Sequence, residues 1–298
     1  LTKAPEYFHS ILEFEQAKSA SGLFMASYSA DAIIAECQAF IDMGDQNYLY
    51  SSFEERLANA ELPDEAKKSY IETNSEHIKN YIFPAYAELK EGLTALRETG
   101  KNNNGLCHLP DGRKFYELTV ASETGSSRTI PELQQLTQGQ MFKDLTDMQK
   151  ILSPTAEGAS VSSDLFKTQG TLLENPDPTV ILNDLQDKLT DNFPKPPKVN
   201  TEIKYVQKSM EEYLSPAFYM IPAIDNPADN VIYINQGHLP DDLSLFTTLA
   251  HEGYPGHLYQ TTYYASRKPD LIRNLLNYGG YVEGWATYCE MMSYYYAP

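Results

Sequence analysis

Apolar residues in the first hundred positions recur at helical spacing. Between residues 29 and 41 they fall three to four apart, at Ile33, Ile34, Cys37 and Phe40, which predicts an amphipathic helix. A second helix is predicted to start at Pro63 and continue toward Leu96, with a kink near Pro84 because proline removes a backbone donor. The turn-rich stretch 100–105 follows. Residues 1–105 are therefore expected to form a helical scaffold.

The middle of the chain has a mixed pattern. Phe115–Val120 is compatible with either a strand or a helix. Thr129-Ile130-Pro131-Glu132 is a good helix start, and helical spacing continues toward Leu152. Residues 153–163 are predicted to form a loop, and Pro178–Leu189 another amphipathic helix.

Short strands are predicted after the proline-rich linker Phe193–Pro197. They are Glu202–Gln207, Ala217–Ile221 and Val231–Asn235, separated by proline and asparagine turns. We expect a small antiparallel sheet within residues 200–236. An exposed sheet edge can bind an extended peptide by adding a strand, and Val231–Asn235 is our candidate for that edge.

Two histidines and a glutamate follow an apolar run, Leu243–Ala250, in the segment His251-Glu252-Gly253-Tyr254-Pro255-Gly256-His257. Neutral imidazole is the commonest zinc ligand, and a glutamate beside the first histidine is where a metallopeptidase keeps its general base. The familiar pattern places the histidines four residues apart, on one helix face. Here they are six apart, which would point them in different directions on an unbroken helix.

Pro255 and Gly256 supply a way to bring the two histidines together. Pro255 has no N–H to donate to the carbonyl of His251, and Gly256 tolerates the dihedral angles that a helix break requires. A widened or interrupted turn is therefore predicted to return His257 to the side of His251.

A third ligand is expected from the segment Tyr281–Glu290. Glu283 and Glu290 lie seven residues apart and share a helix face. We assign Glu283 as the metal ligand and Glu290 as a residue that orients a histidine or a water. The alternative for Glu283 is a carboxylate that stabilises a helix N-terminus. Trp285 is most simply an aromatic residue of the core or of the pocket wall.

The two segments together resemble a bacterial family catalogued as domain of unknown function 885, whose members carry H-E-x-x-P-G-H followed by E-G-W-A. Both motifs are present, at 251–257 and 283–286, and Leu109–Gly112, Thr124-Gly125 and 219–235 are similar to the family pattern. The resemblance implies a mainly α, multihelical fold with active-site helices of the zincin or gluzincin type, a small sheet before them, and zinc-dependent hydrolysis of peptide bonds. It also implies that His251, His257 and Glu283 hold one Zn²⁺ and that Glu252 is the general base.

Family members usually continue well beyond the E-G-W-A helix, whereas this chain ends at Pro298. We therefore interpret it as a fragment of a longer protein, truncated at its C-terminus. Its second region, 106–298, is expected to be metallopeptidase-like, with a motif helix at about 241–267 and a ligand helix at about 279–296.

Composition narrows the function classes. The net charge of −18 argues against binding to nucleic acid or anionic membranes. No apolar run approaches the roughly twenty residues that span a bilayer, so a soluble segment is expected. Three widely spaced cysteines form neither a disulfide framework nor a thiolate zinc site. The chain shows no export leader, and an exported or lipoprotein-type parent is favoured over a cytoplasmic one.

The leading hypothesis is a zinc metallopeptidase acting on a peptide or protein substrate. Tyr219, Tyr254 and His238 are candidate donors to a developing oxyanion. Two alternatives remain open: a non-catalytic protein of the same fold that binds peptides or a partner, and a zinc amidase acting on a non-protein amide. Substrate preference and oligomeric state do not follow from the sequence.

Overall fold

The computed structural model describes residues 1–58, 60–101, 103–152, 177–239, 242–276 and 278–297. Within them the chain is mainly α-helical, with one small three-stranded sheet, as the sequence predicts. Contacts divide the chain into two compact units, Leu1–Tyr116 and Glu117–Pro298. Helix α6 (Gly112–Thr124) contains this boundary, which lies beyond the one near residue 105 that the sequence indicates, and the helix includes the ambiguous segment Phe115–Val120.

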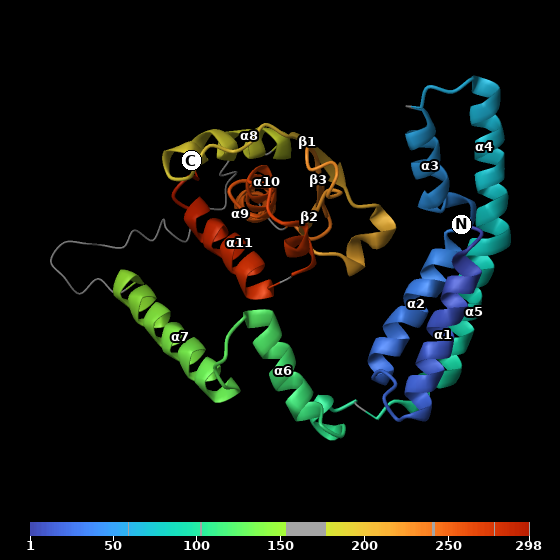
Figure 1. The fold of residues 1–298 in the computed structure, drawn as a ribbon, viewed down its shortest axis with the longest axis horizontal. Coiled ribbons are helices and arrows are strands. Elements are labelled where there is room, and N and C mark those ends of the chain that lie inside the picture. The colour runs from blue at the N-terminus through green and yellow to red at the C-terminus, as the bar shows by residue number, and fades with distance from the viewer. Residues whose placement is uncertain (59, 102, 153–176, 240–241, 277, 298) are drawn as a thin grey trace. The chain divides into compact units, whose positions relative to one another are not determined.

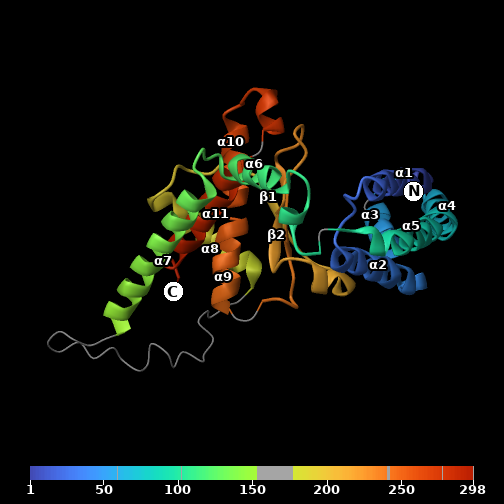
Figure 2. The ribbon, with the colours of Figure 1, turned by 90° about the horizontal axis from the view of Figure 1, so that it is seen from below.

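The first unit is helical and has its own core. Helices α1 (Ala4–Ala20) and α2 (Ser27–Asp42) both pack against α5 (Phe83–Leu96), and the three lie side by side in Figures 1 and 2. A Cβ atom on Gly92 would lie 2.4 Å from Leu12, so glycine permits this close approach of α5 to α1. Their shared core contains Leu12, Phe24, Ala30, Cys37, Leu89 and Leu93.

The rest of this unit contains α3 (Tyr48–Ala58) and α4 (Asp64–His77), which contact each other. Between α4 and α5 the chain takes a π-helical turn at Ile78–Ile82. Pro84 cannot donate to the carbonyl four residues before it, so a wider turn here has a direct cause. The kink predicted near Pro84 is therefore present as a π-helical turn just before the proline.

The second unit contains the sheet, whose strands are β1 (Asn200–Tyr205), β2 (Ala217–Met220) and β3 (Asp229–Ile234). The strand order is β1-β3-β2. Strand β2 pairs with β3 in antiparallel fashion, whereas β1 and β3 are parallel, so the sheet is mixed rather than fully antiparallel as expected. The choice of Val231–Asn235 as the edge is wrong, because β3 is the central strand and β2 forms an edge.

Helices pack against one face of the sheet. Helix α9 (Asp242–Glu252) contacts β2, α8 (Pro178–Lys188) and α11 (Gly279–Ser293), and Figure 2 shows it alongside β2. Helix α10 (His257–Ser266) contacts both α9 and α11. The buried core between them includes Leu185, Ile232, Ile234, Phe246, Leu249 and Leu258. This packing makes α9 a buried helix with one end beside the edge strand.

Other parts of the second unit bear less on the site. Helix α7 (Ile130–Leu152) agrees with the helix predicted from Thr129. The loop predicted at 153–163 lies outside the described residues. Across the parts of the chain that the structure describes, no helix has both the length and the apolar character needed to cross a membrane.

Candidate metal centre

The predicted interruption between the two histidines is present. Helix α9 ends at Glu252 and α10 begins at His257, and the Tyr254–Pro255 peptide bond between them is cis. The Gly253 N–H still donates to the carbonyl of Leu249 at 2.8 Å, and the Gly256 N–H reaches back to the carbonyl of Ala250 at 2.9 Å. Gly253 and Gly256 therefore keep backbone partners, while the turn widens the helix by enough to bring His257 beside His251.

Gly256 is required by the close approach of backbone in this turn. A Cβ atom at this position would lie 1.8 Å from the carbonyl oxygen of His251, which no side chain can occupy. Gly253 is also closely packed, since a Cβ atom there would lie 2.3 Å from Leu182 on α8. The contact at Gly256 is with a backbone oxygen and cannot be relieved by a change of side-chain rotamer. Glycine is therefore more strictly required at position 256 than at position 253.

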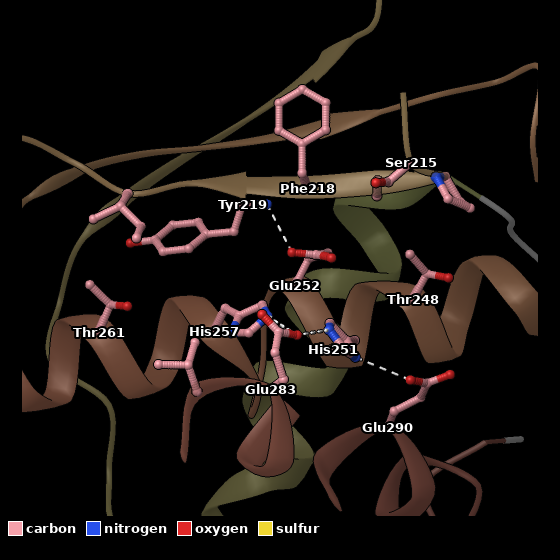
Figure 3. A pocket seen from close by; sticks show the side chains of 14 residues that line it. Ser215, Phe218, Tyr219, Thr248, His251, Glu252, His257, Thr261, Glu283 and Glu290 are labelled. Carbon is pink, nitrogen blue, oxygen red and sulfur yellow. Dashed lines mark hydrogen bonds and ion pairs between the residues drawn. The ribbon is translucent and has the colours of Figure 1, made fainter. Parts of the chain in front are cut away.

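The turn brings three donor groups together. The His251 and His257 ring centroids lie 4.8 Å apart, and the Nε2 atoms of both rings lie 3.6 Å from Oε2 of Glu283 on α11 (Figure 3). One ligand atom from each residue falls within 4.8 Å of the other two. Zinc bonds of about 2.0–2.2 Å place tetrahedral ligand atoms roughly 3.3–3.6 Å apart. The two Nε2–Oε2 distances of 3.6 Å lie at the upper end of this range, and imidazole nitrogen and carboxylate oxygen are both donors that bind zinc.

Glu290 lies on the other side of the His251 ring. Its Oε2 atom is 3.1 Å from Nδ1 of His251 (Figure 3). A proton on Nδ1 donated to this carboxylate leaves Nε2 with a free lone pair that points toward Glu283 and His257. The two glutamates therefore contact different nitrogens of the same imidazole.

Burial favours a neutral His257. Its surroundings lower the pKa of the imidazole, first through desolvation and then through the neighbouring His251, while Glu283 acts in the opposite direction. A neutral imidazole is the form that can donate a lone pair to a metal. The electrostatic surroundings therefore agree with the ligand geometry.

Glu252, the last residue of α9, points away from the histidines toward the sheet. Its Oε2 accepts a hydrogen bond from the Tyr219 N–H on β2 at 2.8 Å (Figure 3). Burial raises the pKa of this carboxyl group, with the hydrogen bond from Tyr219 opposing that shift. The carboxylate is thus fixed between the metal-ligand cluster and an edge strand.

A pocket of about 530 Å³ connects these groups. His251, Glu252, His257, Glu283 and Glu290 all line it, together with β2 and the two residues that precede that strand. The site residues therefore share one solvent-accessible space, bounded on one side by the sheet edge and on the others by α9, α10 and α11.

Thr248 and Thr261 also line this pocket, and no motif marks them. Their helical spacing could have identified them, because Thr248 lies three residues before His251 and Thr261 four residues after His257. Ser215 and Pro216 line the pocket as well. Their position follows from the pairing of β2 at the sheet edge, which local sequence does not reveal.

The candidate oxyanion donors are not gathered at the metal-ligand cluster. Tyr219 lines the pocket, but its hydroxyl donates to Oδ1 of Asn230 at 2.6 Å. Tyr254 is buried and does not line this pocket, and His238 is exposed and does not line it either. Trp285 is half-buried and donates its indole N–H to the carbonyl of Pro255 at 2.8 Å. Of Tyr219, Tyr254 and His238, only Tyr219 therefore lines the pocket, and a role in stabilising an oxyanion stays a prediction.

The fold and the site together define a mainly helical protein with a two-histidine, one-glutamate cluster beside the edge of a small mixed sheet. The family model described as bacterial protein of unknown function (DUF885) matches residues 1–295. The chain belongs to this family, as its two motifs indicate. No match was found among curated proteins.

A solved structure has a similar fold. It is the crystal structure of a protein from Colwellia psychrerythraea described as a candidate lipoprotein, with a TM-score of 0.82 and 19% sequence identity. The alignment covers 99% of this chain and 54% of that protein, so the chain spans about half of its length. At this level of identity the similarity establishes the fold alone.

Proposed function

We propose that this protein is a zinc-dependent metallopeptidase. The observation that supports this most strongly is the convergence of His251, His257 and Glu283, whose ligand atoms lie within 4.8 Å of one another, with a further acidic residue, Glu252, facing the same pocket. Three protein ligands and an open fourth position are typical of catalytic zinc sites. When bound, Zn²⁺ would supply a Lewis acid that polarises a peptide carbonyl and acidifies a water molecule.

Glu252 would perform the proton transfers. It accepts a proton from the attacking water, whose oxygen forms a bond to the carbonyl carbon, and then passes that proton to the amine as the C–N bond breaks. The hydrogen bond from the Tyr219 N–H holds one carboxylate oxygen in place. Glu290 would keep His251 in the tautomer that presents Nε2 to the metal.

Strand β2 offers a binding edge for peptide backbone. The Asn235 N–H donates to the carbonyl of Pro216, which marks these two as a hydrogen-bonded pair in the antiparallel ladder. Such pairs alternate, so the backbone groups of Ala217 and Tyr219 point away from β3. The Tyr219 N–H already donates to Glu252 in that direction. The remaining outward groups are the N–H and the carbonyl of Ala217 and the carbonyl of Tyr219. They can form hydrogen bonds with the backbone of an extended substrate.

A zinc-loaded Glu252→Gln variant tests the proposed general base. Glutamine keeps the shape and can still accept a hydrogen bond from Tyr219, but it cannot take up the proton, so hydrolysis should fall by about 100-fold or more while zinc stays bound. The measurement is turnover on peptide libraries and on non-protein amides, with zinc content determined on the same samples. Glu202→Gln, which changes an exposed carboxylate on β1, is the matched control.

Two results would contradict this proposal. Turnover retained in Glu252→Gln would remove Glu252 as the base. Zinc bound by the wild-type chain without turnover on either substrate panel would instead favour a protein that binds peptides or a partner through the same pocket.

The parent protein is also proposed to be exported or attached as a lipoprotein. The description of the structural neighbour from Colwellia psychrerythraea supports this location. Fractionation of the source cells followed by detection of the protein is the test, and recovery in the cytoplasmic fraction alone would contradict it.

A further inference from the structure

The carbonyl of Pro255 accepts hydrogen bonds from two side chains of α11. The indole N–H of Trp285 donates to it at 2.8 Å, and the thiol of Cys289 donates to it at 3.4 Å. Pro255 is buried and lies between His251 and His257, in the turn that separates α9 from α10. A buried carbonyl outside regular helix needs such partners, because water cannot reach it.

Both donors are themselves held in place. Trp285 packs edge-to-face on Phe193 at 5.9 Å between ring centroids, and its ring lies nearly parallel to that of Tyr259 at 6.4 Å. Cys289 is fully buried, and burial raises the pKa of its thiol to about 12, so it keeps the proton that it donates. The two donors are therefore rigid features of α11.

The spacing along α11 connects these contacts to the metal-ligand cluster. Trp285 and Cys289 are four residues apart on one helix face, while Glu283 and Glu290 are seven apart on the adjacent face. One face contacts the turn between the histidines, and the other presents carboxylates to the histidines themselves. A single rigid helix thus fixes the position of the turn relative to the carboxylates.

We infer that Trp285 and Cys289 are positioning residues of the metal centre: by donating to the Pro255 carbonyl, they hold the Gly253–Gly256 turn in the form that sets His257 beside His251. The metal-binding consequence rests on the proposed function. The role in holding the turn does not, because it is a property of the metal-free chain. Trp285 therefore has a chemical role in the E-G-W-A segment, beyond filling space in the core.

The test uses variants that remove the donors and keep most of the packing. Trp285→Phe retains an aromatic ring without an N–H, Cys289→Ala removes the thiol, and the double variant leaves the Pro255 carbonyl without either donor. A second double variant, Trp285→Phe with Cys289→Ser, replaces the thiol by a hydroxyl that can also donate to the Pro255 carbonyl. Tyr288→Phe is the matched control, because it removes an exposed hydroxyl from the same helix.

Two readouts separate positioning from general destabilisation. Amide hydrogen exchange of the metal-free chain reports the opening of the turn, and zinc affinity is measured by competition with a chromophoric chelator. In the double variant the Gly253 and Gly256 amides, which donate to the carbonyls of Leu249 and Ala250, should exchange at least about tenfold faster, with the rest of the second unit unchanged. Zinc affinity of the same variant should fall about 10- to 100-fold. The variant with Trp285→Phe and Cys289→Ser should recover part of both the exchange protection and the zinc affinity. Tyr288→Phe should change neither quantity.

Three outcomes would overturn the inference. The first is unchanged exchange in the turn. The second is faster exchange throughout the second unit with a matching loss of thermal stability, which would mean a structural role only. The third is a turn that opens while zinc affinity stays at the wild-type value. If the wild-type chain binds no zinc, the proposed function fails, and the exchange of the turn alone then decides whether Trp285 and Cys289 hold it.

Discussion

The His251 imidazole has a carboxylate at each of its ring nitrogens. Glu283 lies 3.6 Å from Nε2, and Glu290 lies 3.1 Å from Nδ1. Only one of these nitrogens can carry the proton in the neutral ring, and a hydrogen bond to Glu290 selects Nδ1. At the scale of single residues, the form of His251 that could bind a metal therefore depends on Glu290, which lies outside the candidate ligand set.

Replacing Glu290 by alanine should weaken zinc binding without abolishing it. Loss of the partner of Nδ1 frees the His251 ring to rotate or change tautomer, and such losses typically cost 10- to 100-fold in metal affinity. Chelator competition measures the change, with Glu202→Ala as the control for removal of an exposed carboxylate. Equal zinc affinities for wild type and Glu290→Ala would show that the contact has no role in metal binding.

At the scale of elements, the break between α9 and α10 could be predicted from the sequence, and the sheet pairing could not. Pro255 has no amide proton at the position where a continuous helix needs one, so its effect is local and visible in the motif. The pairing of β3 with β1 and β2, and the contact of β2 with α9, join residues that are distant in sequence. For that reason the three strands were predicted correctly, whereas the prediction of which strand forms the edge of the sheet was wrong.

The residues that line the pocket differ in how far they could be predicted from the sequence. Thr248 and Thr261 follow from helical spacing around the two histidines. Ser215, Pro216 and Ala217 line the pocket because β2 is an edge strand next to α9. The grouping of His251, His257 and Glu283 could be predicted from sequence because these residues lie in two short helical segments, whereas the pocket wall formed by β2 depends on tertiary packing.

Gly256→Ala tests the turn between the two helices. The added methyl group would meet the carbonyl oxygen of His251 at 1.8 Å, so the backbone must move. We expect a loss of roughly 2–4 kcal/mol in the free energy of unfolding and a marked loss of zinc binding. Chemical denaturation and chelator competition give the two quantities.

The control for this substitution is Gly139→Ala on α7, where nothing lies within 4 Å of the added atom. It should leave zinc binding unchanged and leave stability equal or raised by up to about 1 kcal/mol. If Gly256→Ala behaved like Gly139→Ala, the turn would not have the close backbone contact described above.

At the scale of the whole molecule, the candidate site belongs entirely to the second unit. The three ligands, Glu252 and the sole tryptophan of the chain, Trp285, all lie within Glu117–Pro298. The first unit has separate apolar clusters built from α1, α2, α3 and α5 with the π-helical turn. A ligand of the site should therefore stabilise the second unit directly, and Trp285 fluorescence reports the unfolding of that unit.

Zinc returned to the chelator-treated protein should raise the unfolding transition that Trp285 reports. A ligand at 100 times its dissociation constant stabilises the folded state by about 2.7 kcal/mol, provided that it does not bind the unfolded chain. Thermal scans with and without zinc measure the shift, and His251→Ala should show none. An equal shift in His251→Ala, or no shift in the wild type, would place zinc binding elsewhere or exclude it.

The most direct measurement of the central claim is the zinc content of the purified protein by plasma mass spectrometry. Wild type is compared with His251→Ala, His257→Ala and Glu283→Ala, and His238→Ala serves as the control because His238 is exposed and does not line the pocket. The account predicts one equivalent of zinc in the wild type and in His238→Ala, and its loss in the other three variants. Zinc absent from the wild type after incubation with the ion, or retained by all three ligand variants, would contradict it.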